Sequence, residues 1–208
     1  MAYPLAWNPV LRTKSESWHL VGASRSGGRS IANVEQVIAG PTAYWKASLT
    51  IPVVDRSRIL AFNAMMAALD GRAGTVLVPI SDLGRAPVRE GVNPFNDARL
   101  FLTAAPALLN ATALSLTRQI GGPVLPGQHF SINGRLYRLI SAAGGDTSVP
   151  KSFPIAFRPW LREDVVQGTF LEFSKPVCIM RLASDDTGAL ELQLARYGTV
   201  TLDLVEAF

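Results

Sequence analysis

The sequence predicts a mainly β protein, a β-sandwich with one packed α-helix, plus a second small antiparallel β-barrel or β-sandwich module. Only 17% of the 208 residues are charged, and 14 Pro and 17 Gly interrupt the chain at short intervals, which favours many short strands. Apolar and polar residues alternate over residues 44–51, as in a sheet with one buried face. Asn133-Gly134, between two apolar runs, is typical of a type I′ hairpin turn, which needs positive φ at both central residues.

The first forty residues predict short elements joined by flexible segments. Two prolines break residues 1–12, which we expect to form an extended arm that needs a partner. Residues 18–21 and 34–38 are rich in β-forming side chains and predict two short strands. Between them, the Gly- and Ser-rich residues 24–30 predict a flexible loop that carries two arginines.

One amphipathic helix is predicted directly after the strand at residues 44–51. Asp55 is a suitable N-cap for a helix over residues 56–70, and Gly71 stands where a helix ends in the left-handed conformation. Four apolar residues recur at helical spacing and predict a stripe that faces the core: Ile59, Phe62, Met66 and Leu69.

The middle of the chain alternates strands with a long loop. Residues 74–80 predict a strand, and residues 81–96, with two glycines and two prolines, predict a loop that is functional or part of an interface. Residues 111–118 predict another strand, whereas residues 104–110 are compatible with a short helix.

The Asn133-Gly134 hairpin organises the smaller module. A two-residue turn there places Phe130 opposite Tyr137 and Ile132 opposite Arg135. Three further runs have strand character: residues 153–157, 170–173 and 177–180. Two alternating runs near the end predict a closing hairpin: residues 190–195 and 200–205.

These elements divide the chain into two parts. We expect residues 1–97 and 183–208 to form a β-sandwich domain that contains the helix at 56–70. Residues 98–182 would form an inserted small β-module, and the final hairpin would return to complete the first sheet.

Composition argues against several function classes. The net charge is +4, but the 20 Lys and Arg are scattered with no run longer than two, so we expect no nucleic-acid partner. The single cysteine, Cys178, lies in an apolar strand and is expected to be buried. Neither a signal peptide nor a membrane span is recognisable, so we expect synthesis and assembly in a cytoplasm.

The residues that carry catalysis in other proteins do not form a recognisable motif here. His129 with Asp146 or Asp164 lacks the nucleophile elbow of a Ser-His-Asp hydrolase. Glu163-Asp164 resembles a carboxylate pair, but neighbours on a strand face opposite ways. Two distant histidines and one cysteine predict no metal site, and no phosphate-binding glycine motif is present. We therefore expect no enzymatic activity, no cofactor and no metal.

Aromatic residues leave a second function open. Four tryptophans are available to stack on a sugar ring: Trp7, Trp18, Trp45 and Trp160. Trp45 belongs to the buried face of its strand, whereas Trp160 lies in a proline-stiffened turn and could sit at a rim. A carbohydrate-binding module that recognises a host receptor is therefore the alternative.

Several phrases of the chain resemble a known class of proteins. YWKASLTIP, then ALDGRAGTVLVPISD, LPGQHFSINGRLYRLIS, FRPWLREDVVQGTFLEF, PVCIMRLA and VTLDLVEAF follow one another in an order similar to that of tail proteins of long-tailed bacteriophages, of the distal-tail or minor-tail kind. The similarity extends over most of the chain from about Trp45, and it carries no catalytic residue.

This resemblance implies a virion structural protein that assembles as a ring, often a hexamer, at the distal tail or baseplate hub. Its expected partners are copies of itself, the tail tube protein and the tail hub or tip proteins, without direct contact to nucleic acid or membrane. Assembly would bury side chains between neighbouring subunits. The expected subunit-contact residues are Tyr3, Trp7, Arg25, Arg29 and Trp160.

Overall fold

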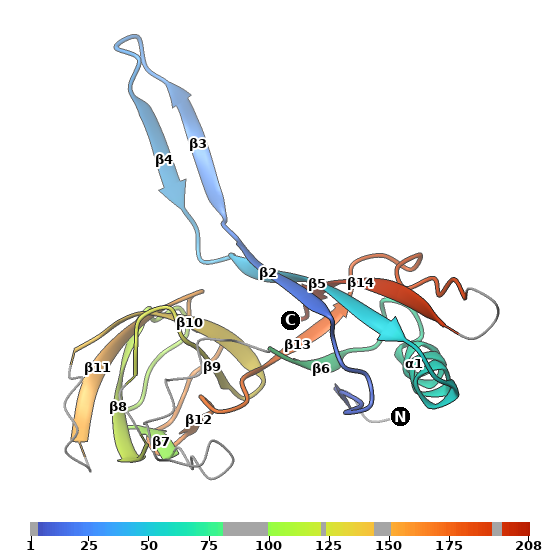
Figure 1. Cartoon of the computed structure of the whole chain (residues 1–208). Coiled ribbons are helices and arrows are strands. Elements are labelled where there is room, and N and C mark those ends of the chain that lie inside the picture. The colour runs from blue at the N-terminus through green and yellow to red at the C-terminus, as the bar shows by residue number, and fades with distance from the viewer. Residues whose placement is uncertain (1–3, 81–99, 122–123, 144–150, 193–196) are drawn as a thin grey trace. The chain divides into compact units, whose positions relative to one another are not determined.

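The protein is described here by a computed structural model that covers residues 4–80, 100–121, 124–143, 151–192 and 197–208 (Figure 1). The chain divides into two compact units. The first contains residues 1–19, 45–81 and 177–208, and the second contains residues 20–44 and 82–176.

The first unit is built on a six-stranded sheet whose order is β1-β6-β13-β14-β5-β2. The strands are β1 (Leu5–Ala6), β2 (Ser15–Val21), β5 (Tyr44–Val53), β6 (Val76–Pro79), β13 (Val177–Leu182) and β14 (Gly198–Glu206). β14 pairs antiparallel with both β5 and β13. The last strand of the chain therefore completes the first sheet, as the sequence predicts.

The alternation predicted for β5 is confirmed. Trp45, Ala47, Leu49 and Ile51 are buried, whereas the residues between them are partly or fully exposed. The same alternation buries Cys178, Met180 and Leu182 on β13. Apolar side chains from strands far apart in sequence thus share one face of the sheet.

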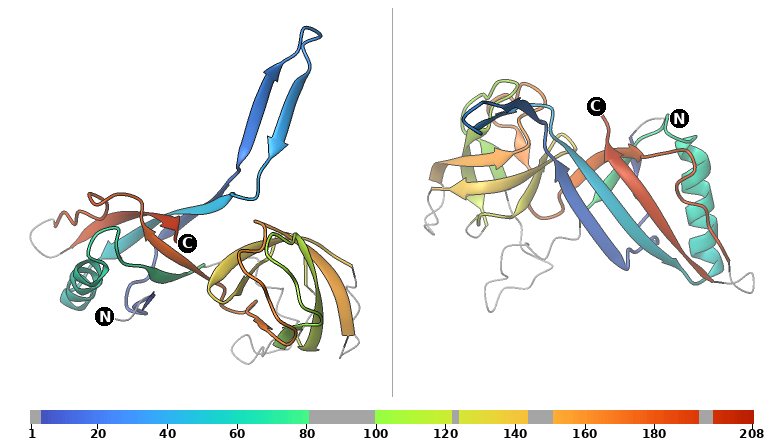
Figure 2. Two further views of the ribbon diagram at one scale, coloured as in Figure 1. Left: turned by 180° about the vertical axis from the view of Figure 1, so that it is seen from behind. Right: turned by 90° about the horizontal axis from the view of Figure 1, so that it is seen from above.

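Helix α1 (Arg56–Leu69) begins directly after the predicted N-cap Asp55 and ends one residue before the predicted end at residue 70. The side chain of Asp55 accepts a hydrogen bond from the backbone nitrogen of Arg58 at 2.8 Å, which satisfies a free N–H group of the first turn. Asp70 ends the helix with a positive φ of 48°. Phe62, Met65 and Leu69 are the buried residues of the helix, which lies beside the sheet (Figure 2).

The second unit contains a nearly closed barrel with the strand order β12-β7-β8-β11-β10-β9. Its strands are β7 (Leu100–Thr103), β8 (Ala113–Ile120), β9 (His129–Ile132), β10 (Arg135–Ala142), β11 (Lys151–Arg158) and β12 (Phe170–Leu171). Ser131 of β9 and Glu172, directly after β12, exchange two backbone hydrogen bonds of 2.9 Å. This single bridge joins the two ends of the sheet and nearly closes the barrel, so little of either edge strand is left open.

The predicted hairpin forms strands β9 and β10 of this barrel. Phe130 pairs with Tyr137, and Ile132 pairs with Arg135, as predicted. Asn133 and Gly134 have φ values of 48° and 78°, the positive values that a type I′ turn requires. Phe130 contacts the rings of Tyr137, Phe157 and Phe173 with centroid distances of 5.0 to 5.6 Å. An aromatic cluster is therefore the centre of the barrel core.

A separate two-stranded antiparallel ribbon consists of β3 (Ser24–Arg29) and β4 (Glu35–Ala39). It is the long blue hairpin of Figure 1. Here the sequence prediction was partly wrong, because residues 24–29 were expected to be a flexible loop. Gly27 and Gly28 instead form an irregularity in the pairing between Ser26 and Arg29, where a bulge accommodates them.

The N-terminal arm is not free over its described part. β1 pairs parallel with β6, and Leu11 is 1% exposed. The indole of Trp7 donates a hydrogen bond to the carbonyl oxygen of Leu11 at 2.9 Å. These contacts hold the segment against its own sheet, which the two prolines did not indicate.

Two other predicted elements differ in the structure. Residues 104–110 contain no helix, because Ala107 forms an antiparallel bridge with Val165 instead. Residues 190–192 are not a strand, and residues 193–196 of the predicted closing hairpin lie outside the described residues. The predicted loop at 81–96 also lies outside them.

Within the described residues, the division into units differs from the predicted one at two places. The boundary near the C-terminal end falls between Pro176 and Val177, because β13 pairs with β6 and β14 rather than with the barrel. The residues of the ribbon also group with the second unit.

The predicted fold class is confirmed: the protein is mainly β, with a helix-bearing sheet and a barrel-like module. Within the described residues, α1 is the one α-helix. None of the described helical structure is long and apolar enough to cross a membrane.

Candidate functional site

The β3–β4 ribbon is the most exposed structured part of the described chain. Every residue from Ser24 to Ala39 is exposed to solvent. Four large apolar side chains are among them: Ile31, Val34, Val37 and Ile38, with exposed fractions from 58 to 110%. A two-stranded ribbon without a covered face is only marginally stable in water. Contiguous exposed apolar side chains of this kind are typical of interaction surfaces.

The pairing of the ribbon determines which side chains share a face. Ser26 pairs with Val37 and Arg25 pairs with Ile38. Because residues directly opposite one another project to the same side, each face carries one of these aliphatic side chains. The ribbon therefore presents apolar surface on both faces.

The tip of the ribbon is held by its own hydrogen bonds. The backbone nitrogen of Ser30 donates to the carbonyl of Val34 at 3.0 Å, and the nitrogen of Asn33 donates back to Ser30 at 2.8 Å. Asn33 has a φ of 60° and its side-chain oxygen accepts from the guanidinium of Arg29 at 3.2 Å. These bonds leave Ile31 projecting fully into solvent.

If another surface covers the ribbon, its aliphatic side chains contribute more free energy than its charged ones. Burial of one Val or Ile side chain contributes about 1.5–3 kcal/mol, whereas an exposed ion pair contributes about 0–1 kcal/mol. Arg25 and Arg29, which the sequence analysis singled out, lie on β3 and are exposed. In any contact made by the ribbon, Val37 and Ile38 would contribute more free energy than these two arginines.

The base of the ribbon is fastened by an arginine from another part of the second unit. The guanidinium of Arg162 donates to the carbonyl oxygen of Pro41 at 3.0 Å and also to the carbonyl oxygen of Ala43. Gly40, at the end of the ribbon, donates to the carbonyl of Ala23 at 2.8 Å.

The structure distributes the five predicted contact residues over different places. Arg25 and Arg29 share the ribbon. Trp160 is half-buried next to the buried Leu161, and Tyr3 lies outside the described residues. Trp7 is half-buried within the first unit. The four described residues of this set therefore do not all belong to one element, and Trp7 belongs to a different unit from the other three.

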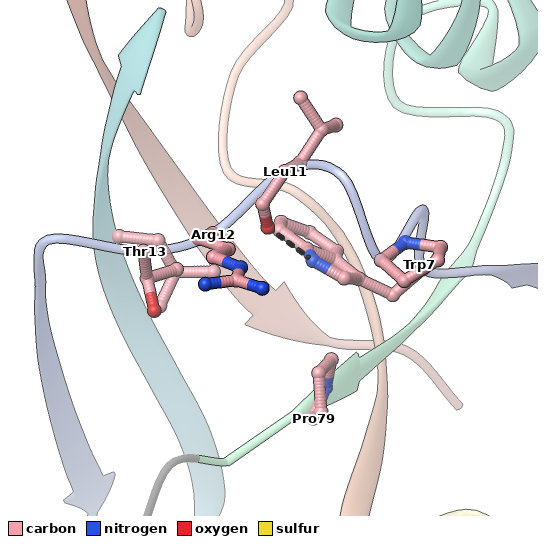
Figure 3. A pocket seen from close by; sticks show the side chains of 7 residues that line it. Trp7, Leu11, Arg12, Thr13 and Pro79 are labelled. Carbon is pink, nitrogen blue, oxygen red and sulfur yellow. Dashed lines mark hydrogen bonds between the residues drawn. The ribbon is translucent and has the colours of Figure 1, made fainter. Parts of the chain in front are cut away.

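Trp7 lines a hollow of about 370 Å³ in the first unit (Figure 3). Its walls are formed by Trp7, Pro9, Leu11, Arg12, Thr13, Leu49 and Pro79. Figure 3 shows the indole bonded to the carbonyl of Leu11, with Pro79 below it. These lining residues combine apolar surface with one cation and include no carboxylate, histidine or thiol.

The residues considered for catalysis have structural partners. Nε2 of His129 accepts a hydrogen bond from Arg138 at 2.9 Å. The side chain of Asp164 accepts from the backbone nitrogen of Leu109 at 2.7 Å, and Glu163 accepts from the side chain of Asn133 at 2.8 Å. The two neighbouring carboxylates thus bind different loops, and Asp146 lies outside the described residues.

The tryptophans considered for sugar binding are partly unavailable. Trp45 is completely buried in the core of the first unit. Trp18 donates through its indole nitrogen to Glu16 at 3.0 Å. Among the described residues, no group of three or more His, Cys, Asp and Glu side chains is placed to hold a metal ion.

Comparisons with known protein families and with curated proteins found no match. The candidate site therefore rests on the structure and on the residues themselves.

Proposed function

We propose that the protein is a structural subunit of a long-tailed bacteriophage tail. In this proposal it forms a ring with copies of itself, expected to be a hexamer, at the distal tail or baseplate hub. The ring joins the tail tube to the tail tip, and the protein does not act as an enzyme.

The observation that carries this proposal is the exposed β3–β4 ribbon. An isolated ribbon with four exposed large aliphatic side chains gains stability when another surface covers it. A second copy of the same chain can supply such a surface, and identical copies repeat the same contact geometry. Repetition of one such contact around an axis closes a ring.

The resemblance to distal-tail and minor-tail proteins supports the same interpretation. It rests on phrases that fall on elements of both units, such as YWKASLTIP on β5 and INGRLYRLIS on β9 and β10. A protein that serves as a connector needs rigid modules and contact surfaces, and it needs no reactive side chains. The described arrangement of His129, Glu163 and Asp164 as structural groups agrees with that requirement.

The partners proposed for the ring are the tail tube protein on one side and the tail hub or tip proteins on the other. The protein would be assembled in the host cytoplasm and would reside in the virion. Neither role needs a cofactor.

The first test is the mass of the purified protein by light scattering across a range of concentrations, with negative-stain microscopy of the same samples. We expect a species several times heavier than 22.4 kDa and ring-shaped particles. Mass spectrometry of purified virions should also detect the chain in the tail fraction. A monomer at all concentrations, together with its absence from virions, would refute the proposal.

A further inference from the structure

Arg162 contacts the ribbon where the ribbon meets the rest of the chain. One nitrogen of its guanidinium donates to the carbonyl of Pro41 and another donates to the carbonyl of Ala43. The planar fork of a guanidinium presents donors in a fixed geometry, so one side chain can hold two carbonyl groups together.

The other backbone bond described at the base of the ribbon, from Gly40 to the carbonyl of Ala23, joins the two strands to each other and not to the barrel. A side-chain carbon added at Gly22 would meet no atom within 4 Å, whereas one added at Gly40 would lie 3.3 Å from the carbonyl oxygen of Ala23. Pro41 has no N–H group and cannot donate to a neighbouring strand. A ribbon joined through such residues can change direction unless a side chain fastens it.

The barrel holds Arg162 in place from the other side. Its backbone nitrogen donates to the hydroxyl of Tyr137 at 3.3 Å, and Tyr137 is completely buried among the core aromatics. The adjacent Leu161 is also buried, and its nitrogen donates to the carbonyl of Ala111 at 2.8 Å. The guanidinium is therefore carried by a rigid segment of the barrel.

We propose that Arg162 is a positioning residue that fixes the direction of the β3–β4 ribbon for its contact with a second copy. The inference rests on the proposed function, because the ribbon is the contact surface there. Arg162 acts through the carbonyls of Pro41 and Ala43 and belongs to the base of the ribbon rather than to its exposed surface.

A pre-directed ribbon loses less conformational freedom when it binds. Loss of the two charge-assisted hydrogen bonds should therefore weaken self-association by about 10- to 100-fold. The side chains that make the contact would remain unchanged.

The experiment compares Arg162→Ala and Arg162→Lys with the wild type. Lysine keeps the charge but lacks the planar fork, so we expect it to restore association only in part. Arg158→Ala is the matched control, because Arg158 is an exposed arginine of the neighbouring strand that donates to the carbonyl of its neighbour Phe157 at 3.0 Å. Thermal melting establishes that each variant is folded.

Two measurements separate the positioning role from the proposed function. Sedimentation equilibrium gives the association constant. Spin labels on cysteines introduced at the exposed Ala32 and Gln119 give the distance distribution between the ribbon tip and the barrel in dilute protein. The native Cys178 is completely buried and should not react.

We expect Arg162→Ala to broaden the distance distribution and to weaken association, whereas Arg158→Ala should change neither. An unchanged distribution in Arg162→Ala would overturn the positioning role, whatever the association constant. A broadened distribution in a protein that is monomeric even as wild type would support the fastening of the ribbon and would overturn the proposed ring. If Arg162→Ala does not fold, the same comparison between Arg162→Lys and Arg158→Ala decides.

Discussion

Glu206 and Trp45 are joined across the first sheet, although 161 positions separate them in the chain. The side chain of Glu206 accepts a hydrogen bond from the backbone nitrogen of Trp45 at 3.0 Å, and the two residues are 4% and 0% exposed. The bond lies beside the pairing of β14 with β5, between Val205 and Lys46. The backbone N–H group of Trp45 therefore binds a buried carboxyl group and not a backbone carbonyl of the neighbouring strand.

Glu206→Ala should destabilise the first unit by about 1–3 kcal/mol, because it leaves a buried amide without its acceptor. Urea unfolding followed by tryptophan fluorescence measures the change. Glu206→Gln keeps an acceptor oxygen and should cost less. Equal losses in both variants would show that the bond to Trp45 is not the cause.

Phe130→Ala should destabilise the barrel by about 3–5 kcal/mol, because Phe130 contacts three other aromatic rings at full burial. Phe170, on β12, is 41% exposed, and its replacement by Ala should cost about 1 kcal/mol. Chemical denaturation of the two variants provides the comparison. A small loss in Phe130→Ala would contradict the aromatic cluster as the centre of the core.

Gly188→Ala should be more harmful than Gly168→Ala, although both glycines have a positive φ, of 90° and 82°. A methyl group at Gly188 would lie 2.7 Å from a side-chain carbon of Leu202 and 2.9 Å from one of Met66, whereas Gly168 has open space. We expect the crowding to add about 1–3 kcal/mol to the strain that the two substitutions share. Free energies of unfolding from urea titrations measure the difference, and equal values would argue against close packing of α1 on β14.

The double variant Val37→Ser, Ile38→Ser should weaken self-association by at least about tenfold, because each lost aliphatic contact is worth more than 1 kcal/mol when buried in an interface. Its melting temperature should stay close to that of the wild type, since both side chains are exposed in the single chain. Analytical ultracentrifugation measures the association.

Val166→Ser is the matched control for this variant. Val166 is 69% exposed and lies outside the ribbon, so its replacement should leave association unchanged. If both variants weaken association equally, the effect is one of general surface hydrophobicity and the ribbon is not the specific contact.

Local sequence patterns predicted those elements whose structure depends mainly on neighbouring residues. The alternation of β5, the cap at Asp55 and the turn at Asn133-Gly134 each depend on neighbouring residues, and each is observed. Residues 24–29 were misread because Gly and Ser are typical of loops, whereas the partner strand β4 pairs with them as β3.

The candidate site was predicted only in part. Arg25 and Arg29 were selected for their charge, but Ile31, Val34, Val37 and Ile38 were not, because an aliphatic residue on a short strand is ordinarily buried. The exposed ribbon could have been predicted from one feature of the sequence. The apolar residues of β4 lie opposite a segment of Gly, Ser and Arg, which has no apolar side chains to cover them.

The sequence by itself determined the β-rich character, the position of the helix and the register of the central hairpin, because these depend on side-chain periodicity and turn chemistry within a few residues. Tertiary structure alone decided that β13 joins the first sheet, that the N-terminal segment packs against it and that the ribbon remains uncovered. Burial and strand pairing between distant segments are set by competition among all exposed edges and apolar faces of the folded chain, and no local stretch contains that information.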